Sequence, residues 1–427
     1  MRRSPGGISP NPRHSSSPIL PAVAPPSLDA GSPKYIEIGS TRVPVRVGEL
    51  WTAKQRAGHN LHEISYRACF KPQLPAYYIS RHSQPGETVY DPFMGRGTTV
   101  LEAALQGRVP WGNDASPLSA ILTAPRLDPP RQTEVEERLS SLSLDSPTRS
   151  NDELLTFYHP DTLREILNLR EYLLRREATG ALDSVDAWIR MVAVNRLTGH
   201  SAGFFSVYSL PPNQAASVAS QRRINDRLRQ VPPRRPVKPL LLRKSKALLS
   251  AITPEERARL RSVSGSVRLL TGDAAGTSPL PSGSVRLVVT SPPFLNIVDY
   301  AKDNWLRNWF CGIDPRSVHL TQAGTVAEWE AKMTEVFREL ARLLAPRGAI
   351  AFEVGEVRNG QVRLEESVVR SADRAGLLPI EVFVNAQHFT KTAHCWGITN
   401  GSRGTNTNRV VLLSREGLAP TPTSRSA

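Results

Sequence analysis

The sequence predicts an α/β protein with a mostly parallel central sheet that is split by a mainly helical insertion. Three observations lead to this fold class. Residues 86–127 read as strand, glycine-rich turn, helix and strand, and the same alternation returns at 266–290 and 326–355. Alternating strands and helices imply parallel strands joined by right-handed crossovers. Between these stretches, residues 131–260 carry helical patterns instead.

The N-terminal elements follow in order along the chain. Residues 1–34 are rich in Pro, Ser and Gly, so we expect a disordered tail there, and another at residues 416–427. Order begins at KYIEIGSTRVPVRVGEL, which alternates like a hairpin. Next, ETVYDPF predicts a strand, MGRGTT a turn, TTVLEAALQGR a helix and VPWGNDAS a second strand.

The C-terminal elements repeat this rhythm. SVRLLTGDA and SVRLVVTSPP predict strands, VAEWEAKMTEVFRELARLLAPRG an amphipathic helix, and AIAFEVGEV and NRVVLLSR further strands. We therefore predict one sheet domain from residues 35–130 and 260–415, and an insertion at residues 131–259.

The charge of the chain points to a polyanionic partner. Its formal net charge is +15 and its pI is about 10.2, and most of the basic residues lie inside the predicted folded part. Such a field suits nucleic acid. The three cysteines are widely spaced and form no CxxC, which predicts neither a disulfide framework nor a zinc site. No apolar stretch has the length of a membrane span and no signal peptide is visible, so we expect a cytoplasmic protein.

The string DPFMGRGTT predicts a ligand-binding turn. Asp91 ends a strand, Gly95 and Gly97 lie in the turn, and Thr98 and Thr99 open the next helix. Glycine lets the backbone approach a ligand, and a helix N-terminus directs N–H groups at it. A bare GxG also occurs in turns that need glycine for packing alone, but the flanking Asp-Pro-Phe and Thr-Thr make this string rarer.

Two further acids end neighbouring predicted strands. Asp114 follows the glycines by about 20 residues, where an acid can accept the hydroxyls of a ribose. Asp273 ends another strand in LLTGDA. Each acid alone is compatible with a simple helix N-cap. As a set on the carboxyl edge of a parallel sheet, the acids and the glycine turn predict one nucleoside pocket.

The string TSPPF ends a buried strand in an unusual way. Ser291, Pro292, Pro293 and Phe294 present a hydroxyl, a stiff backbone and an aromatic ring. Neither proline can continue a sheet ladder, because neither has an N–H. A strand-terminating turn would explain the prolines alone, but not their combination with the glycine string and Asp273.

DPFMGRGTT followed by TSPPF resembles the amino-group DNA methyltransferases, and HEISYRACFKPQLPAYYI (62–79) looks like the remaining cofactor motif of that family. The resemblance implies a Rossmann-like class I methyltransferase fold with S-adenosyl-L-methionine as cofactor. It implies that the catalytic residues are Ser291, Pro292, Pro293 and Phe294. It implies that the cofactor is bound by Phe70, Lys71, Asp91, Pro92, Phe93, Gly95, Gly97, Thr98, Thr99, Asp114, Ser116, Asp273 and Ala274. No metal is expected.

The chemistry of an exocyclic amine explains the SPPF residues. The lone pair of the cytosine N4 amine is delocalised into the ring, so acceptors for its N–H bonds favour a more nucleophilic nitrogen. The Ser291 hydroxyl and the Pro292 carbonyl supply two acceptors, and the prolines fix them before substrate arrives. Phe294 offers a stacking face for a base that has left the duplex. In-line transfer then depends mainly on positioning.

The serine form of the motif is typical of cytosine-N4 enzymes, so we predict that class. Adenine-N6 methylation, an RNA substrate and an inactive binding protein remain alternatives. Cytosine-C5 methylation is not predicted, because no cysteine follows a proline. The sequence has neither a deaminase HxE…CxxC signature nor GxxxxGK[ST].

Target recognition is predicted in the insertion, and duplex DNA is the predicted partner. Residues 195–214 and the basic run from Arg222 to Lys246 place aromatics beside arginines. His200 is a further candidate, although a lone histidine is more often structural. Near the C-terminus, Lys391 and Arg403 are candidates as well.

The segment that follows SPPF is expected to form a helix. Asp299, Tyr300, Asn304 and Trp305 begin a helix and fit pocket residues and structural residues equally well. A companion restriction nuclease would be a separate protein or absent, because nothing in this chain resembles a nuclease.

Overall fold

The computed structural model describes residues 27–28, 34–39, 41–50, 58–67, 69–147, 152–210, 214–293, 300–318, 323–357, 362–386 and 407–417. These residues build an 11-stranded sheet in the order β1-β3-β10-β11-β8-β7-β4-β5-β6, with β2 beside β3 and β9 beside β8. The strands are β1 (Ser27–Leu28), β2 (Lys34–Ile38), β3 (Thr41–Glu49), β4 (Thr88–Asp91), β5 (Val109–Asp114), β6 (Arg268–Thr271), β7 (Val285–Thr290), β8 (Leu344–Val357), β9 (Val362–Arg363), β10 (Leu378–Ala386) and β11 (Thr407–Ser414).

Five neighbouring strands, β6, β5, β4, β7 and β8, are parallel. The strand β11 runs antiparallel between β8 and β10. After β4 the chain moves outward to β5 and β6, and it then returns to the other side of β4 through β7 and β8. The pair β4/β7 is therefore the point where the strand order reverses, which is where open α/β sheets bind their ligands. The predicted Rossmann-like α/β fold is confirmed.

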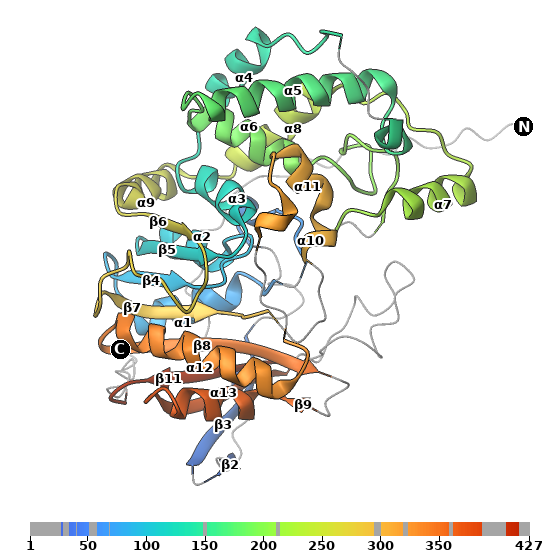
Figure 1. Ribbon diagram of the computed structural model, residues 1–427. Helices are drawn as coiled ribbons and strands as arrows, with labels where there is room; N and C mark the ends of the chain where they lie inside the picture. Colours follow the sequence, from blue (N-terminus) through green and yellow to red (C-terminus); the bar gives the residue numbers. More distant parts are fainter. Residues whose placement is uncertain are drawn as a thin grey trace, which may run out of the picture.

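Helices cover both faces of the sheet (Figure 1). On β7, Val288 packs with α12 and α13 residues, whereas Leu287 and Val289 pack with α1 residues. Successive side chains of a strand point to opposite faces, so a strand covered on both sides needs a continuous apolar run. The helices of the sheet region are α1 (Gln73–His82), α2 (Thr98–Leu105), α3 (Pro117–Leu127), α10 (Tyr300–Asp303), α11 (Trp305–Phe310), α12 (Val326–Leu343) and α13 (Leu364–Asp373).

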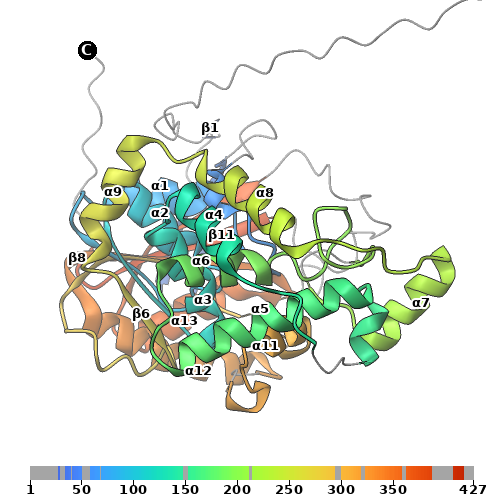
Figure 2. The same cartoon turned by 90° about the horizontal axis from the view of Figure 1, so that it is seen from above.

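The segment between β5 and β6 is helical, as predicted. It forms a layer beyond the β6 edge of the sheet, at the top of Figure 1, and lies over the sheet when seen from above in Figure 2. Trp188, Phe157 and Phe205 are fully buried in its core, which continues into α2 and α3. Its helices are α4 (Gln132–Ser141), α5 (Pro160–Ala178), α6 (Ser184–Val194), α7 (Val218–Leu228), α8 (Val237–Leu249) and α9 (Pro254–Ser264).

One boundary differs from the expectation. Ser27 and Leu28 pair with β3 as β1, and Lys34 is the first residue of β2, so the predicted disordered tail at 1–34 overlaps the sheet. The residues KYIEIGSTRVPVRVGEL do form the expected hairpin, β2 and β3. The predicted sites Phe294, Asp299, Lys391 and Arg403 lie outside the described residues.

Candidate functional site

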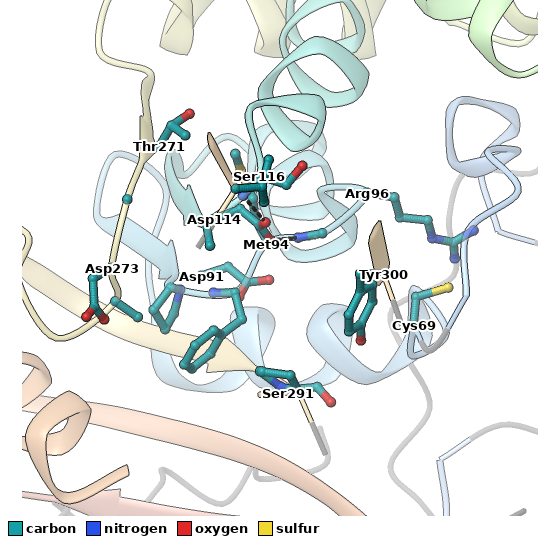
Figure 3. A pocket seen from close by; sticks show the side chains of 18 of the residues that line it. Cys69, Asp91, Met94, Arg96, Asp114, Ser116, Thr271, Asp273, Ser291 and Tyr300 are labelled. Atoms are coloured by element: carbon teal, nitrogen blue, oxygen red, sulfur yellow. Dashed lines mark hydrogen bonds between the residues drawn. The ribbon is translucent and has the colours of Figure 1, made fainter. Parts of the chain in front are cut away.

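A cavity of about 670 Å³ opens at the carboxyl ends of β4, β5, β6 and β7. Figure 3 shows Asp91, Asp114, Ser291 and Tyr300 arranged around it, with Asp273 at its other end. Strand ends far apart in the sequence meet here because parallel strands share one carboxyl edge. The predicted site residues that line it are Phe70, Asp91, Pro92, Phe93, Gly95, Thr98, Asp114, Ser116, Asp273, Ala274, Ser291 and Pro293.

Asp91 connects the two motifs. Its Oδ1 accepts a hydrogen bond from Thr290 Oγ1 at 2.6 Å and another from the Phe93 N–H at 3.1 Å. Thr290 is the last residue of β7 and directly precedes Ser291. Burial raises the pKa of Asp91 to about 7, against the lowering effect of these hydrogen bonds. The glycine string and TSPPF are therefore held together by a buried side-chain contact.

The glycine turn is shaped by sterics as well as by ligand access. Gly95 and Gly97 have φ of +50° and +72°, the region that glycine adopts without cost. A Cβ on Gly97 would lie 2.3 Å from Thr123 Oγ1, in α3. Gly97 is thus needed for close packing at the N-cap of α2, and it does not line the cavity itself.

Asp114 holds this turn against the end of β5. Its Oδ2 accepts the Gly95 N–H and its Oδ1 accepts the Ser116 N–H, each at 2.9 Å. Each carboxylate oxygen has a second lone pair, so the group retains acceptor capacity toward the cavity. Burial raises the pKa of Asp114, while both backbone hydrogen bonds act in the opposite direction.

Asp273 lies at the more open end of the cavity. Its Oδ1 accepts the Ala275 N–H at 2.9 Å, and Lys332 Nζ on α12 lies 2.8 Å from its Oδ2. Burial acts to raise the pKa of Asp273, but these two bonds and the charge of Lys332 lower it below its ordinary value. This acid is therefore charged, and one of its two carboxylate oxygens already contacts Lys332 of the same chain.

The SPP segment is fixed from two sides. Thr99 Oγ1 donates to the Val289 carbonyl at 3.0 Å, and Trp329 Nε1 donates to the Pro293 carbonyl at 3.2 Å. Trp329 is 2% exposed. Ser291 and Pro293 reach the cavity, whereas Pro292 is buried behind them. The backbone that carries the proposed acceptors is therefore anchored to α2 and α12.

The remaining predicted residues play supporting parts. Lys71 is exposed and does not line the cavity, although its carbonyl accepts the Leu74 N–H at the start of α1. Thr99 is fully buried and reaches β7 rather than the cavity. Both positions match the motif strings, yet neither of them lines the cavity.

Sequence reasoning identified one wall of the cavity only in part. Tyr66 and Tyr300 line it as a stacked pair with ring centroids 6.4 Å apart. Asn304 also lines it, so Tyr300 and Asn304 are pocket residues, whereas Trp305 donates to the Ala216 carbonyl at 3.1 Å. Tyr66 lies within the motif-like string 62–79, but nothing in its spacing distinguishes it. Other unpredicted lining residues are Cys69, Met94, Arg96, Ala115, Thr271, Gly272, Asn308, Pro315, Ser317, Val318, Ala323, Trp329, Lys332, Met333 and Val336.

Comparison with known proteins finds similarity for part of the chain. Residues 30–117 match a family model described as DNA methylase, N6_N4_Mtase. The type II methyltransferase M.MjaII of Methanocaldococcus jannaschii is 36% identical over 80 residues, which is 18% of this chain and 15% of that protein. M.MvaI of Kocuria varians is 27% identical over 147 residues, 34% of this chain and 28% of that protein. The chain thus spans less than a third of either relative.

These matches are to DNA methylases, and the matched residues 30–117 include β4, β5 and the glycine turn at the carboxyl edge of the sheet. The resemblance predicted from the motifs is thereby confirmed: residues 30–117 are similar to the amino-group DNA methyltransferases. Among solved structures, TrmN of Thermus thermophilus aligns with 83% of this chain and 51% of its own, at 13% identity and TM-score 0.32. A putative DNA modification methylase of the same organism, complexed with S-adenosyl-L-methionine, covers 36% of this chain and 57% of its own, at 22% identity and TM-score 0.22.

Two kinds of feature are absent from the described residues. In that part of the chain no three His, Cys, Asp or Glu side chains are grouped as a metal site requires. Within the same residues, no helix combines the length and the apolar character of a membrane span.

Proposed function

We propose that this protein is an S-adenosyl-L-methionine-dependent DNA methyltransferase that acts on the exocyclic N4 amine of cytosine in duplex DNA. The observation that carries the proposal is the single cavity shared by Gly95, Asp114 and Ser291, with Asp91 bonded to Thr290 across the two motifs. The proposal also divides the chain into a methyltransferase domain (35–130 and 260–415) and a DNA-contacting insertion (131–259).

The residues of the cavity fit the cofactor. Gly95 has no side chain between the turn and the cavity, and Asp91 and Asp114 offer buried acceptors with raised pKa values. Asp114 and Asp273 would hold hydroxyls and amines of the nucleoside, with Phe70, Phe93 and Ala274 as apolar contacts. Asp91 would face a cationic group, since a nearby positive charge lowers the pKa of a buried acid. When bound, the cofactor supplies an electrophilic methyl group.

The target amine would be held by Ser291 and the Pro292 carbonyl. The Trp329 indole donates to the next carbonyl, that of Pro293, and so anchors the residue that follows Pro292. Fixed acceptors need no reorganisation as charge develops on the amine. Phe294 remains a proposed stacking residue.

The type of base is the part of the proposal that most needs a direct measurement. The serine in the motif favours cytosine-N4 over adenine-N6. Methylated duplex DNA should be digested to nucleosides and analysed by mass spectrometry. We expect N4-methylcytosine; N6-methyladenine would instead establish the second candidate. A faster reaction with structured RNA than with duplex DNA, at one fixed salt concentration, would contradict the DNA substrate.

The matched relatives are type II methyltransferases, which supports a role beside a separate restriction endonuclease. In that role methylation protects host sites from cleavage. The proposed compartment is the cytoplasm, where such a pair would meet host DNA.

We propose that the arm, defined as residues 214–235, contacts DNA. It contains α7, which extends from the body on the side toward which β7 runs (Figures 1 and 2). The arm has six arginines and one acid, Asp226. Leu228 and Val231, which are 47% and 82% exposed, lie among these arginines. Apolar side chains flanked by arginine suit insertion between base steps beside phosphate contacts.

The base of the arm is joined to the wall of the cavity. The Ala215 N–H donates to the Asp303 carbonyl at 2.9 Å. Arg67 Nη1 contacts Gln214 Oε1 at 3.0 Å and Asp303 Oδ2 at 2.9 Å. Asp303 ends α10, the helix that Tyr300 begins. DNA bound by the arm would therefore lie next to the entrance of the cavity.

Neutralising one arm arginine should weaken DNA binding in a salt-dependent way. For Arg227→Gln we expect the slope of log K against log salt to fall by about 0.9, the value for one lost phosphate contact. The matched control is Arg261→Gln, which removes one exposed charge from α9 on the opposite side of the molecule. Fluorescence anisotropy with a duplex at several salt concentrations measures both. Equal slopes for the two variants would contradict a DNA contact by the arm.

A further inference from the structure

A buried carboxylate next to Ser291 takes no part in the function described so far. Glu353 lies in β8 and is 5% exposed. In the parallel pair β7/β8, Thr290 is opposite Phe352, so Ser291 and Glu353 follow side by side. On β11, Val410 is opposite Glu353, and Asn408 lies two residues before Val410.

The surroundings of Glu353 are polar but uncharged. Its carboxylate is hydrogen-bonded by the side chains of Ser291 and Asn408, and among the described residues it forms no ion pair. A buried carboxylate without a cation is costly, and such groups are concentrated at functional sites. Burial raises the pKa of Glu353 to about 7, while the two hydrogen bonds act to lower it.

Charged side chains on the neighbouring elements have partners of their own. Asp91 at the end of β4 is bonded to Thr290, and Arg409 on β11 is paired with Glu365. On α1, Arg81 lies over the Tyr77 ring, 4.5 Å from its centroid. The pKa of the Glu353 carboxylate is therefore set mainly by its burial and by its hydrogen bonds with Ser291 and Asn408.

We propose that Glu353 is the proton acceptor for the methylated amine and acts through Ser291. This inference rests on the proposed function and deepens it. Ionised Glu353 accepts the Ser291 O–H, which leaves the lone pairs of Ser291 Oγ for an N–H of the target amine. Protonated Glu353 donates to Ser291 instead, and the Ser291 proton is then free to point at the amine. The charge state of Glu353 thus decides whether Ser291 is an acceptor.

The atoms balance as follows. A bond forms between the amine nitrogen and the methyl carbon, and the carbon–sulfur bond breaks with its electron pair on sulfur. The nitrogen now carries one proton too many. That proton passes to Ser291 Oγ as the Ser291 proton passes to Glu353, and the N–H electron pair stays on nitrogen. Glu353 returns its proton to solvent after the product leaves.

The role gives this SPPF motif a physical rationale. An aspartate at position 291 would present a carboxylate to the amine directly. Here the carboxylate lies one strand away and is connected through the hydroxyl. Since the argument concerns an exocyclic amine, it holds for cytosine and for adenine alike.

The test compares the wild-type protein with Glu353→Gln, which keeps the shape and removes the acceptor. The single-turnover rate on duplex DNA should rise with pH in the wild type, with a midpoint near 7. In Glu353→Gln we expect a rate lower by about 10²- to 10⁴-fold at pH 8 and a flat pH profile. Ser291→Ala/Glu353→Gln should be no slower than Ser291→Ala, because both residues act as one unit.

A second readout needs no catalysis. Difference infrared spectroscopy of the protein alone, wild type minus Glu353→Gln, should show a carboxyl group that titrates near pH 7. In Ser291→Ala the midpoint should move upward, because a hydrogen bond to the charged form is lost. Glu365→Gln, which alters an equally buried acid paired with Arg409, is the control and should leave the rate profile unchanged.

The outcomes separate the two proposals. An active wild type together with an unchanged rate and pH profile in Glu353→Gln overturns the role of Glu353 and leaves the methyltransferase intact. If the wild type methylates neither cytosine nor adenine, the proposed function is contradicted, and the role of Glu353 is contradicted as well.

Discussion

Ser291→Ala should lower the methylation rate by about 100- to 1,000-fold, the usual effect of removing one preorganised hydrogen-bonding group from an active site. The variant removes both the acceptor for the amine and the hydroxyl that connects it to Glu353. Cofactor affinity, measured by calorimetry, should stay within about twofold of wild type, because Asp91, Asp114 and the glycine turn are untouched.

The control for this variant is Ser284→Ala. Ser284 lies just before β7 and its hydroxyl donates to the Pro281 carbonyl at 2.5 Å, on the surface. It should methylate DNA at the wild-type rate. Wild-type activity in Ser291→Ala would exclude the acceptor role, and a simultaneous loss of cofactor binding would show that the substitution disturbs the pocket as a whole.

Gly97→Val should abolish cofactor binding and destabilise the fold by about 3–5 kcal/mol. The position has φ of +72°, where a β-branched residue is strongly disfavoured. Its Cβ would also lie 2.3 Å from Thr123 Oγ1 and 2.5 Å from Thr123 Cγ2. The turn would have to move away from α3, and Gly95 and Asp114 with it. Chemical denaturation and calorimetry measure the two effects.

Gly95→Ala is the comparison within the same turn. Gly95 also has positive φ, but the nearest atom to an added Cβ is Tyr66 Cε1 at 3.6 Å. We expect a loss of about 1–2 kcal/mol there and a weakened but measurable cofactor affinity. If Gly97→Val bound the cofactor like the wild type, the cavity would not be the cofactor site.

Local strings with strict chemical demands were predictable from sequence. Asp91, Gly95 and Ser291 belong to rare strings, and the structure brings them to one cavity. Lys71 shows the limit of this reasoning, since it lies in a motif-like string but faces solvent. Thr99 shows another, because its hydroxyl is committed to the Val289 carbonyl.

Residues that arrive from other elements were not predictable. Trp329 has the spacing of an ordinary core residue on α12, and only the structure shows its indole bonded to Pro293. Glu353 lies in an apolar strand pattern, and its meaning depends on the pairing of β7 with β8. Strand order and register are long-range properties, so no local pattern contains them.

The parallel pairing of β5 with β6 has a consequence for how the molecule assembles. Trp111 and Arg268 are partners across this pair, and the whole helical insertion lies between them in sequence. Closing so long a loop costs entropy before any contact rewards it. The four residues of β6 are at the edge of the sheet and none is buried. We therefore expect this edge to join late and to open early, so that amide hydrogens of β6 exchange faster than those of β4 or β7, and Asp273 is the last of the three acids to reach its place.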